Sequence, residues 1–176
     1  EEVLEALSGL PVVQVGPREA ADLVIVNGCA VTAAAERLGR SLVHRGLRDG
    51  ARVILTGCLA QRLGPEDPKT FSEAVEVVPG TSRREAVARR VREVVEGLLA
   101  DPAGARPLSD ASPVRSSRSR PLVKVQDGCD HRCAYCIVPL LRGNSRSLPL
   151  AEATRRVRAA ASREGVGEVV LTGVDL

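Results

Sequence analysis

The stretch "DLVIVNGCAVTAAAERLGRSLVHRGLRDGARVILTGC", residues 22–58, reads as a strand, a helix and a second strand. Its opening run, residues 22–27, is typical of a parallel strand that is buried on both faces, and residues 52–56 repeat the pattern. Between them, Thr32 is a favourable N-cap and Gly50 a favourable end for a helix. Because a single crossover makes two strands of one sheet parallel, the stretch predicts an α/β fold with a parallel sheet.

Two cysteines occupy matching positions at the ends of these strands. Cys29 and Cys58 each lie two residues after a predicted strand, and a glycine precedes each. The carboxyl ends of neighbouring parallel strands meet at one edge of the sheet, where α/β proteins bind their ligands. The matching positions therefore favour a paired ligand role for the two thiols. The alternative is that both are buried core thiols, since free cysteine is often buried.

The rest of the chain divides at a segment of low hydrophobicity. A short strand at residues 74–78 and a helix from about Ser82 complete an N-terminal domain over residues 1–100. The apolar stripe of that helix consists of Val87, Val91, Val94, Val95 and Leu98. Residues 101–120 are rich in Pro, Ser, Gly and Ala and predict a linker. Residues 121–176 then form a second domain.

This second domain begins as another strand–helix–strand unit. The expected elements are a strand at residues 121–125, a helix over about 150–161 and a strand at 168–172. The first of these strands runs directly into a loop that holds three of the five cysteines. Loops that follow strands carry the active sites of α/β barrels, so this loop is a candidate site.

The cysteine loop is "DGCDHRCAYCIVPLLRGNSRS", residues 127–147, with the spacing Cys-x3-Cys-x2-Cys. Its cysteines are Cys129, Cys133 and Cys136. Closely spaced thiolates are good ligands for iron–sulfur clusters, and three of them leave one iron of a four-iron cluster without a protein ligand. Such an open position makes a metal centre reactive, as it does in catalytic zinc sites. The alternatives are a zinc site completed by His131 or a distant ligand, and a redox-active thiol pair.

Composition limits the classes of protein further. The 176 residues are 44% hydrophobic and 27% charged, which is ordinary for a globular protein, but only 1% aromatic. No apolar run approaches a membrane span, and no secretory signal precedes the first helix-like segment. An odd number of cysteines without a leader favours a reducing compartment, so we expect a cytoplasmic protein.

Most of the excess positive charge lies around the cysteine loop. Residues 115–147 contain seven Arg or Lys against two Asp, a local charge of +5, whereas the whole chain has a net charge of +3. Such a region can neutralise the phosphates of RNA. Arg142 and Arg146, just beyond the cysteines, are the better candidates for RNA contacts. The alternative is a solvated linker with surface ion pairs.

Taken together, the motifs resemble those of the methylthiotransferases, a family of radical S-adenosylmethionine (SAM) enzymes. The resemblance rests on "QDGCDHRCAYCIVPLLRGNSRS", "VNGCAVTAAAER", "LTGCLAQR" and "EVVLTGVDL", and it spans almost the whole chain. The segment "RGNSRS" followed by "LTGVDL" looks most like the sequences of the branch that modifies N6-threonylcarbamoyladenosine in transfer RNA. Related branches act on isopentenyladenosine in transfer RNA and on an aspartate of ribosomal protein S12.

The fold that this resemblance implies has two parts. A parallel α/β methylthiotransferase domain is followed by the start of a radical SAM (β/α) partial barrel. The resemblance also implies a chain truncated at both ends, because the family has a further auxiliary cysteine on an earlier strand, a longer barrel and a C-terminal RNA-binding domain. Gly28 stands where the family more often has threonine. We therefore expect the family's activity from a complete protein and none from this chain alone.

The resemblance implies roles for individual residues of the second domain. The ligands of a radical-generating 4Fe-4S cluster would be Cys129, Cys133 and Cys136. Tyr135 stands where the family has an aromatic residue beside S-adenosylmethionine. The turn at Gly173 and Val174 would lie near the same cofactor.

Cys29 and Cys58 match two of the three ligands of an auxiliary 4Fe-4S cluster. The implied reaction is methylthiolation of carbon 2 of the modified adenosine next to the anticodon. One S-adenosylmethionine yields the radical that removes a hydrogen, and a second supplies the methyl group. The implied partners are transfer RNA, an electron donor of the flavodoxin or ferredoxin type and a sulfur donor, with no membrane. The alternatives are methylthiolation of ribosomal protein S12 and an inactive cluster-binding fragment.

Overall fold

The computed structural model describes residues 3, 7, 9–16, 19–64, 71, 74–79, 84–100 and 119–176. The chain divides into two compact units, residues 1–115 and 116–176. The linker predicted at residues 101–120 lies almost entirely outside the described residues, so the predicted domain limits stay a prediction.

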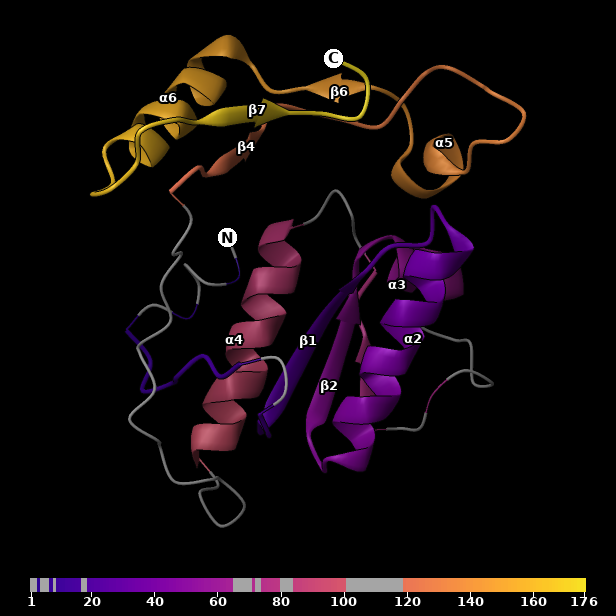
Figure 1. Cartoon of the computed structure of the whole chain (residues 1–176), viewed down its shortest axis with the longest axis vertical. Helices are drawn as coiled ribbons and strands as arrows, with labels where there is room; N and C mark the ends of the chain where they lie inside the picture. Colours follow the sequence, from indigo (N-terminus) through magenta and orange to yellow (C-terminus); the bar gives the residue numbers. More distant parts are fainter. Residues whose placement is uncertain are drawn as a thin grey trace. The chain divides into compact units, whose positions relative to one another are not determined.

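The first unit is built on a three-stranded sheet (Figure 1). Its strands are β1 (Leu23–Gly28), β2 (Arg52–Thr56) and β3 (Val75–Val77), in this order and all parallel. In the ladder between β1 and β2, the register pairs Asn27 with Thr56. The parallel α/β fold predicted from residues 22–58 is therefore confirmed.

Helix α2 (Ala33–Arg48) connects β1 to β2 and lies close against the sheet. The hydroxyl of Thr32 accepts a hydrogen bond from the Ala35 N–H at 3.2 Å, which confirms the predicted N-cap. Close packing depends on glycine: a methyl group added at Gly46 would lie 3.0 Å from Cγ2 of Val53, a residue of β2. A larger side chain at this position would push the helix away from the strand.

Helix α4 (Arg84–Ala100) covers the opposite face of the same sheet (Figure 1). Four of its buried residues form one cluster with Ile54 of β2, and they are Val87, Val91, Val94 and Val95. Since neighbouring residues of a strand point to opposite faces, Ile54 faces α4 while Val53 faces α2. The apolar stripe predicted for this helix is therefore its buried face, with Leu98 partly buried beside it.

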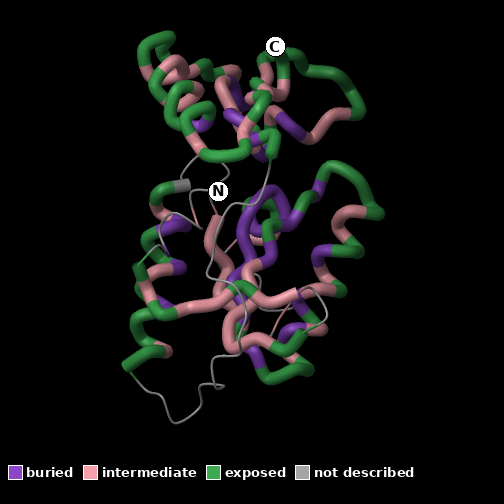
Figure 2. Tube along the Cα trace, turned by 60° about the vertical axis from the view of Figure 1, so that its left-hand side comes forward, coloured by how far each residue is buried: buried purple, intermediate pink, exposed green. Residues whose placement is uncertain are grey.

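A short helix, α3 (Gly57–Leu63), follows β2 directly and was not predicted. Residues 53–60 are all buried, and they give the long purple stretch in Figure 2. Cys29 was predicted to lie two residues after the first strand, and this was wrong by one residue. Strand β1 continues through Gly28, which forms a parallel β-bridge with Gly57. Cys29 is thus the first residue after β1, and Cys58 lies inside the first turn of α3.

The second unit combines a parallel and an antiparallel strand pair. Strand β4 (Leu122–Lys124) pairs in parallel with β7 (Val170–Thr172), and β5 (Gln126–Asp127) pairs antiparallel with β6 (Arg146–Ser147). Its helices are α5 (Val138–Arg142) and α6 (Leu150–Ala161). The predicted strand–helix–strand unit corresponds to β4, α6 and β7, whereas β5, β6 and α5 were not predicted.

Among the described residues, no helix is both long enough and apolar enough to cross a membrane.

Candidate functional site

Cys29 and Cys58 lie at the same edge of the first unit's sheet. They follow Gly28 and Gly57, which form a parallel bridge beyond the ladder of β1 and β2. Cys29 is exposed, Cys58 is only 3% exposed, and neither is in a disulfide. The predicted placement at the ends of neighbouring parallel strands is confirmed. Their role as cluster ligands stays a prediction, and the burial of Cys58 also fits a core thiol.

The backbone between these cysteines is in close contact. Gly57 has φ +84°, and a methyl group added there would lie 2.3 Å from Oδ1 of Asn27 and 2.7 Å from the carbonyl oxygen of Gly28. Only glycine adopts this conformation without strain and leaves the required space. The Cys29 sulfur accepts a hydrogen bond from the Val31 N–H at 3.4 Å. Glycine therefore permits the close approach that brings the two strand ends together.

The helix that carries Cys58 is tied to α2 by an ion-pair cluster. The carboxylate of Glu36, whose side chain is 16% exposed, binds Arg40 of the same helix at 3.0 Å and Arg62 of α3. A carboxylate in the first turn of a helix also interacts favourably with the helix dipole. Glu36 thereby fixes the position of α3 relative to α2.

The cysteine loop of the second unit begins where the parallel pair β4–β7 ends. The Val125 N–H donates to the carbonyl oxygen of Thr172, the last residue of β7, at 2.9 Å. The Cys129 N–H donates to the carbonyl oxygen of Gly143 at 3.1 Å, which closes the loop at its base. Farther along, the Cys136 N–H donates to the Cys133 carbonyl oxygen at 3.0 Å. These main-chain bonds fix the loop at the carboxyl end of a parallel strand pair.

A buried carboxylate holds the base of this loop. Asp127 is 8% exposed and accepts hydrogen bonds from Lys124, from Arg142 at 3.2 Å and from the Gly128 N–H at 3.1 Å. Burial alone would raise the pKa of Asp127, but the bonds from Lys124, Gly128 and Arg142 outweigh it and the pKa is lowered. Asp127 is therefore an anion that joins β4, β5 and α5.

The two arginines predicted to contact RNA have different surroundings. Arg142 is half-buried and paired with Asp127. Arg146 is exposed, and its guanidinium donates to the carbonyl oxygen of Arg142 at 3.2 Å. A role in the structure of the loop is thus visible for Arg142, while contact of either residue with RNA stays a prediction.

Cys129 faces a carboxylate. Its sulfur lies 3.7 Å from Oδ2 of Asp175, and Nε2 of His131 lies 3.3 Å from the same oxygen. The hydrogen bond from the His131 N–H lowers the pKa of the Cys129 thiol. Burial, the charge of Asp175 and the neighbouring Cys133 raise this pKa, and together they outweigh the hydrogen bond, so the pKa of Cys129 is raised. In this arrangement Cys129 is a neutral thiol that donates to Asp175.

Three thiols on one loop suit an iron–sulfur cluster better than a harder metal ion. Cys129 and Cys136 are partly exposed, Cys133 is exposed, and all three are free of disulfides. Within the described residues, no three Cys, His, Asp or Glu side chains are gathered closely enough to hold a metal ion. The donor set thus fits the cluster that the sequence predicts, and its assembly would require these side chains to turn toward one another.

The predicted cofactor contacts lie on two loops. Tyr135 is 91% exposed, so its ring is free to cover a bound molecule. Val174 follows β7, and its N–H donates to Oε1 of Gln126 at 2.7 Å. Gln126, which is 5% exposed, was not predicted as a site residue. The signal that could have found it is an amide side chain directly after the apolar residues of the predicted strand 121–125 and directly before the cysteine loop.

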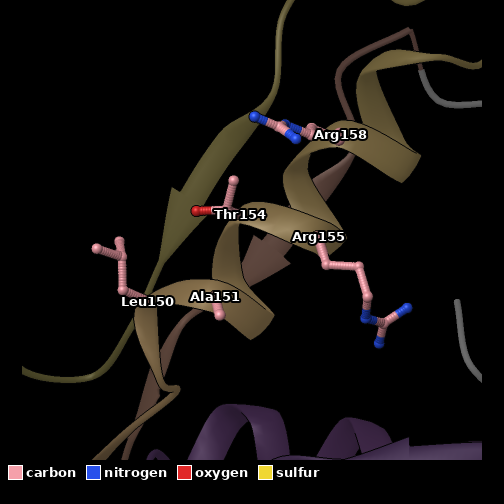
Figure 3. Close-up of a pocket in the computed structure, with 5 residues that line it drawn as sticks. All are labelled: Leu150, Ala151, Thr154, Arg155 and Arg158. Carbon is pink, nitrogen blue, oxygen red and sulfur yellow. The ribbon is translucent and has the colours of Figure 1, made fainter.

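A separate hollow lies on α6, and none of the predicted site residues lines it (Figure 3). Its lining residues are Leu150, Ala151, Thr154, Arg155 and Arg158. Figure 3 shows that they all come from this one helix. The hollow is open, and its largest apolar side chain, Leu150, is 82% exposed. It contains none of the groups that the predicted chemistry requires.

Comparisons with known proteins divide the chain in the same way. Residues 1–80 match the model of "Uncharacterized protein family UPF0004", and residues 123–175 match that of the "Radical SAM superfamily". The second match contains all three cysteines of the loop, and the first contains Cys29 and Cys58.

Individual relatives come from two groups of enzymes. The chain is 31% identical over 167 residues to "Threonylcarbamoyladenosine tRNA methylthiotransferase MtaB" of Rickettsia prowazekii. The aligned segment covers 88% of this chain and 37% of the relative. It is 34% identical over 183 aligned positions to "Ribosomal protein uS12 methylthiotransferase RimO" of Thermus thermophilus. This alignment covers 100% of this chain and 39% of the relative. With MtaB of Thermotoga maritima the identity is 35% over 161 residues, 86% of this chain and 35% of the relative.

The chain thus spans less than two fifths of the length of these relatives. Both domain models match in the order expected for such enzymes, and relatives of both groups match most or all of the chain. The chain therefore belongs to the radical S-adenosylmethionine methylthiotransferase family.

Proposed function

We propose that this protein is a methylthiotransferase that modifies carbon 2 of N6-threonylcarbamoyladenosine, next to the anticodon of transfer RNA. One observation carries the proposal: each unit presents cysteines at the carboxyl end of a parallel strand pair, where α/β proteins bind ligands. The first unit presents Cys29 and Cys58, and the second presents the loop from Cys129 to Cys136.

In this proposal the three thiols of the loop hold a 4Fe-4S cluster, and Tyr135, Gly173 and Val174 border bound S-adenosylmethionine. When bound, the cluster supplies the electron that cleaves S-adenosylmethionine. The chain itself orients the loop through Asp127 and covers the cofactor with an exposed aromatic ring. Cys29 and Cys58 would supply two ligands to a second 4Fe-4S cluster, which would provide the chemistry of sulfur transfer.

The proposed partners follow from this chemistry. The reaction needs an electron donor of the flavodoxin or ferredoxin type and a sulfur donor. Transfer RNA is the substrate, and the exposed Arg146 lies where it could neutralise a phosphate. We place this reaction in the cytoplasm, without a membrane.

A second candidate function is methylthiolation of an aspartate of ribosomal protein uS12. The observation that favours it is that RimO of Thermus thermophilus matches 100% of this chain at 34% identity, whereas the two MtaB relatives match 88% and 86% of it, at 31% and 35% identity. The resemblance of "RGNSRS" and "LTGVDL" to the transfer RNA branch favours the first candidate.

The experiment is deletion of the gene, followed by mass spectrometry of the nucleosides of the host's transfer RNA. We expect the 2-methylthio form to disappear while its threonylcarbamoyl precursor is retained. The wild-type gene and Ser162→Ala, a change at the end of α6, should restore it, and Cys133→Ala should not. An unchanged nucleoside profile together with unmodified uS12 would establish the second candidate. If neither molecule changes, both candidates are wrong.

A further inference from the structure

The buried side chain of Gln126 connects the cysteine loop to the loop that follows β7. Its Oε1 accepts hydrogen bonds from the N–H groups of Val174 at 2.7 Å and Asp175 at 3.0 Å. Its Nε2 donates to the Gly128 carbonyl oxygen at 2.8 Å and to Oγ of Ser145 at 2.9 Å. One side chain thus joins the start of the cysteine loop, the segment before β6 and the end of β7.

Both ends of the amide are needed for this arrangement. The oxygen faces two N–H donors, while the nitrogen faces two carbonyl oxygens, of Asp127 (3.2 Å) and Gly128, and a hydroxyl. A flipped amide would place nitrogen against N–H groups and oxygen against carbonyl oxygens, so the network defines the orientation. A glutamate of the same size would keep the acceptor and lose the donor.

Gly173 lets the second loop lie against this amide. A methyl group added at Gly173 would be 2.9 Å from Oε1 of Gln126 and 2.8 Å from Cδ2 of Leu176. The main chain of Gly173–Asp175 therefore contacts the glutamine directly, with no room for a side chain between them. Asp175 in turn contacts Cys129 across the same space, at 3.7 Å.

We propose that Gln126 is a positioning residue that locks the loop Gly173–Asp175 to the cysteine loop and thereby sets the affinity for S-adenosylmethionine. The locking is a property of the chain itself. Its consequence for the cofactor rests on the proposed function. Gln126 touches neither the thiols nor the cofactor in this proposal, and it acts through the two loops that do.

The locking is tested by amide hydrogen exchange on the full 176-residue chain without iron. In Gln126→Ala, the N–H groups of Val174 and Asp175 should exchange faster by on the order of 10-fold, the effect of losing one or two hydrogen bonds. Gln61→Ala makes the same chemical change at an exposed position of α3 and should leave both rates unchanged. Unchanged exchange at Val174 and Asp175 in Gln126→Ala would overturn the proposal.

Gln126→Glu separates the two ends of the amide. The carboxylate still accepts from Val174 and Asp175, so their protection should persist. It cannot donate to Gly128, so the Cys129 N–H, which bonds to Gly143 beside it, should exchange several-fold faster. A general loss of structure would instead accelerate all three amides equally, and that result would contradict a specific lock.

The consequence for the cofactor is tested by titrating S-adenosylmethionine into the anaerobically reconstituted chain. We expect the affinity of Gln126→Ala to fall by on the order of 10-fold while its iron content equals that of wild type. Equal affinities at equal iron content would overturn the positioning role. A wild-type chain that takes up no iron would count against the proposed function instead, and the exchange rates would still decide whether Gln126 locks the loops.

Discussion

Gly128 occupies a position where neither backbone conformation nor space allows a side chain. Its φ of +75° lies in the left-handed region, and a methyl group there would be 2.1 Å from the carbonyl oxygen of Asn144. Gly143 has the same φ, yet nothing lies within 4 Å of its added methyl group. The two glycines at the base of the cysteine loop therefore share a φ angle but differ in the space around them.

The pair predicts two different costs. Gly143→Ala should lower the free energy of unfolding by about 1–3 kcal/mol, because its backbone (φ 75°, ψ −163°) has a conformation that essentially only glycine adopts, while space for a methyl group is available. Gly128→Ala should cost about 1–3 kcal/mol more, since the backbone of Asn144 must also move. Chemical denaturation of the two variants measures the difference. Equal losses of unfolding free energy in the two variants would contradict this, because they would mean that the backbone at Asn144 moves aside at no energetic cost.

For single residues, the sequence predicts which positions belong to a site better than it predicts which side chains those residues contact. The spacing of Cys129, Cys133 and Cys136 is visible without a structure, because the loop is local in sequence. The role of Gln126 is not, because its partners Val174 and Asp175 are 48 and 49 residues away. Nor could the pairing of Arg142 with Asp127 be read from the sequence, which favoured Arg142 as a contact for RNA.

Among the elements, length decides what the sequence predicts. Helices α2 and α4, with 16 and 17 residues, repeat their apolar positions often enough to be recognised, and β2 between them contains the continuous apolar run Val53–Leu55. Helices α3 and α5 have seven and five residues, too few for a periodic pattern, and both were missed. Strands β5 and β6, of two residues each, are defined by their pairing alone.

Helix α6 carries the most strongly perturbed surface carboxylate. Hydrogen bonds from Arg155 and then Arg156 lower the pKa of Glu152 to about 2 from an ordinary value of 4.5. Because the folded state lowers this pKa, the interaction stabilises the helix above about pH 4.5 and is lost as the pH falls through 2. The exposure of the three side chains keeps the contribution to stability small.

We predict that the carboxyl carbon of Glu152 titrates near pH 2 in an NMR experiment. Replacing both partners, in Arg155→Gln/Arg156→Gln, should move the midpoint up toward 4.5. Arg158→Gln is the control, since the two ion pairs described for Glu152 are with Arg155 and Arg156. A midpoint that stays near 2 in the double variant would show that another group lowers this pKa.

For the whole molecule, the main feature is that each unit has its own cysteine site. Cys29 and Cys58 belong to the first unit, and the three cysteines of the loop belong to the second. Each site is held by contacts within its own unit: Glu36 with Arg62 in the first, and Asp127 with Arg142 in the second. We therefore expect that removing the cysteines of one unit leaves the other unit able to bind its cluster.

Iron analysis of the reconstituted chain measures this most directly. In Cys29→Ala/Cys58→Ala, anaerobic reconstitution with iron and sulfide should still give about four irons, an equal amount of sulfide and a broad brown absorption. Adding Cys133→Ala to this variant should abolish all three signals, whereas adding Ser162→Ala should not change them. A double variant that takes up one zinc ion and no sulfide, or whose iron content is unaffected by Cys133→Ala, would contradict a cluster at the cysteine loop.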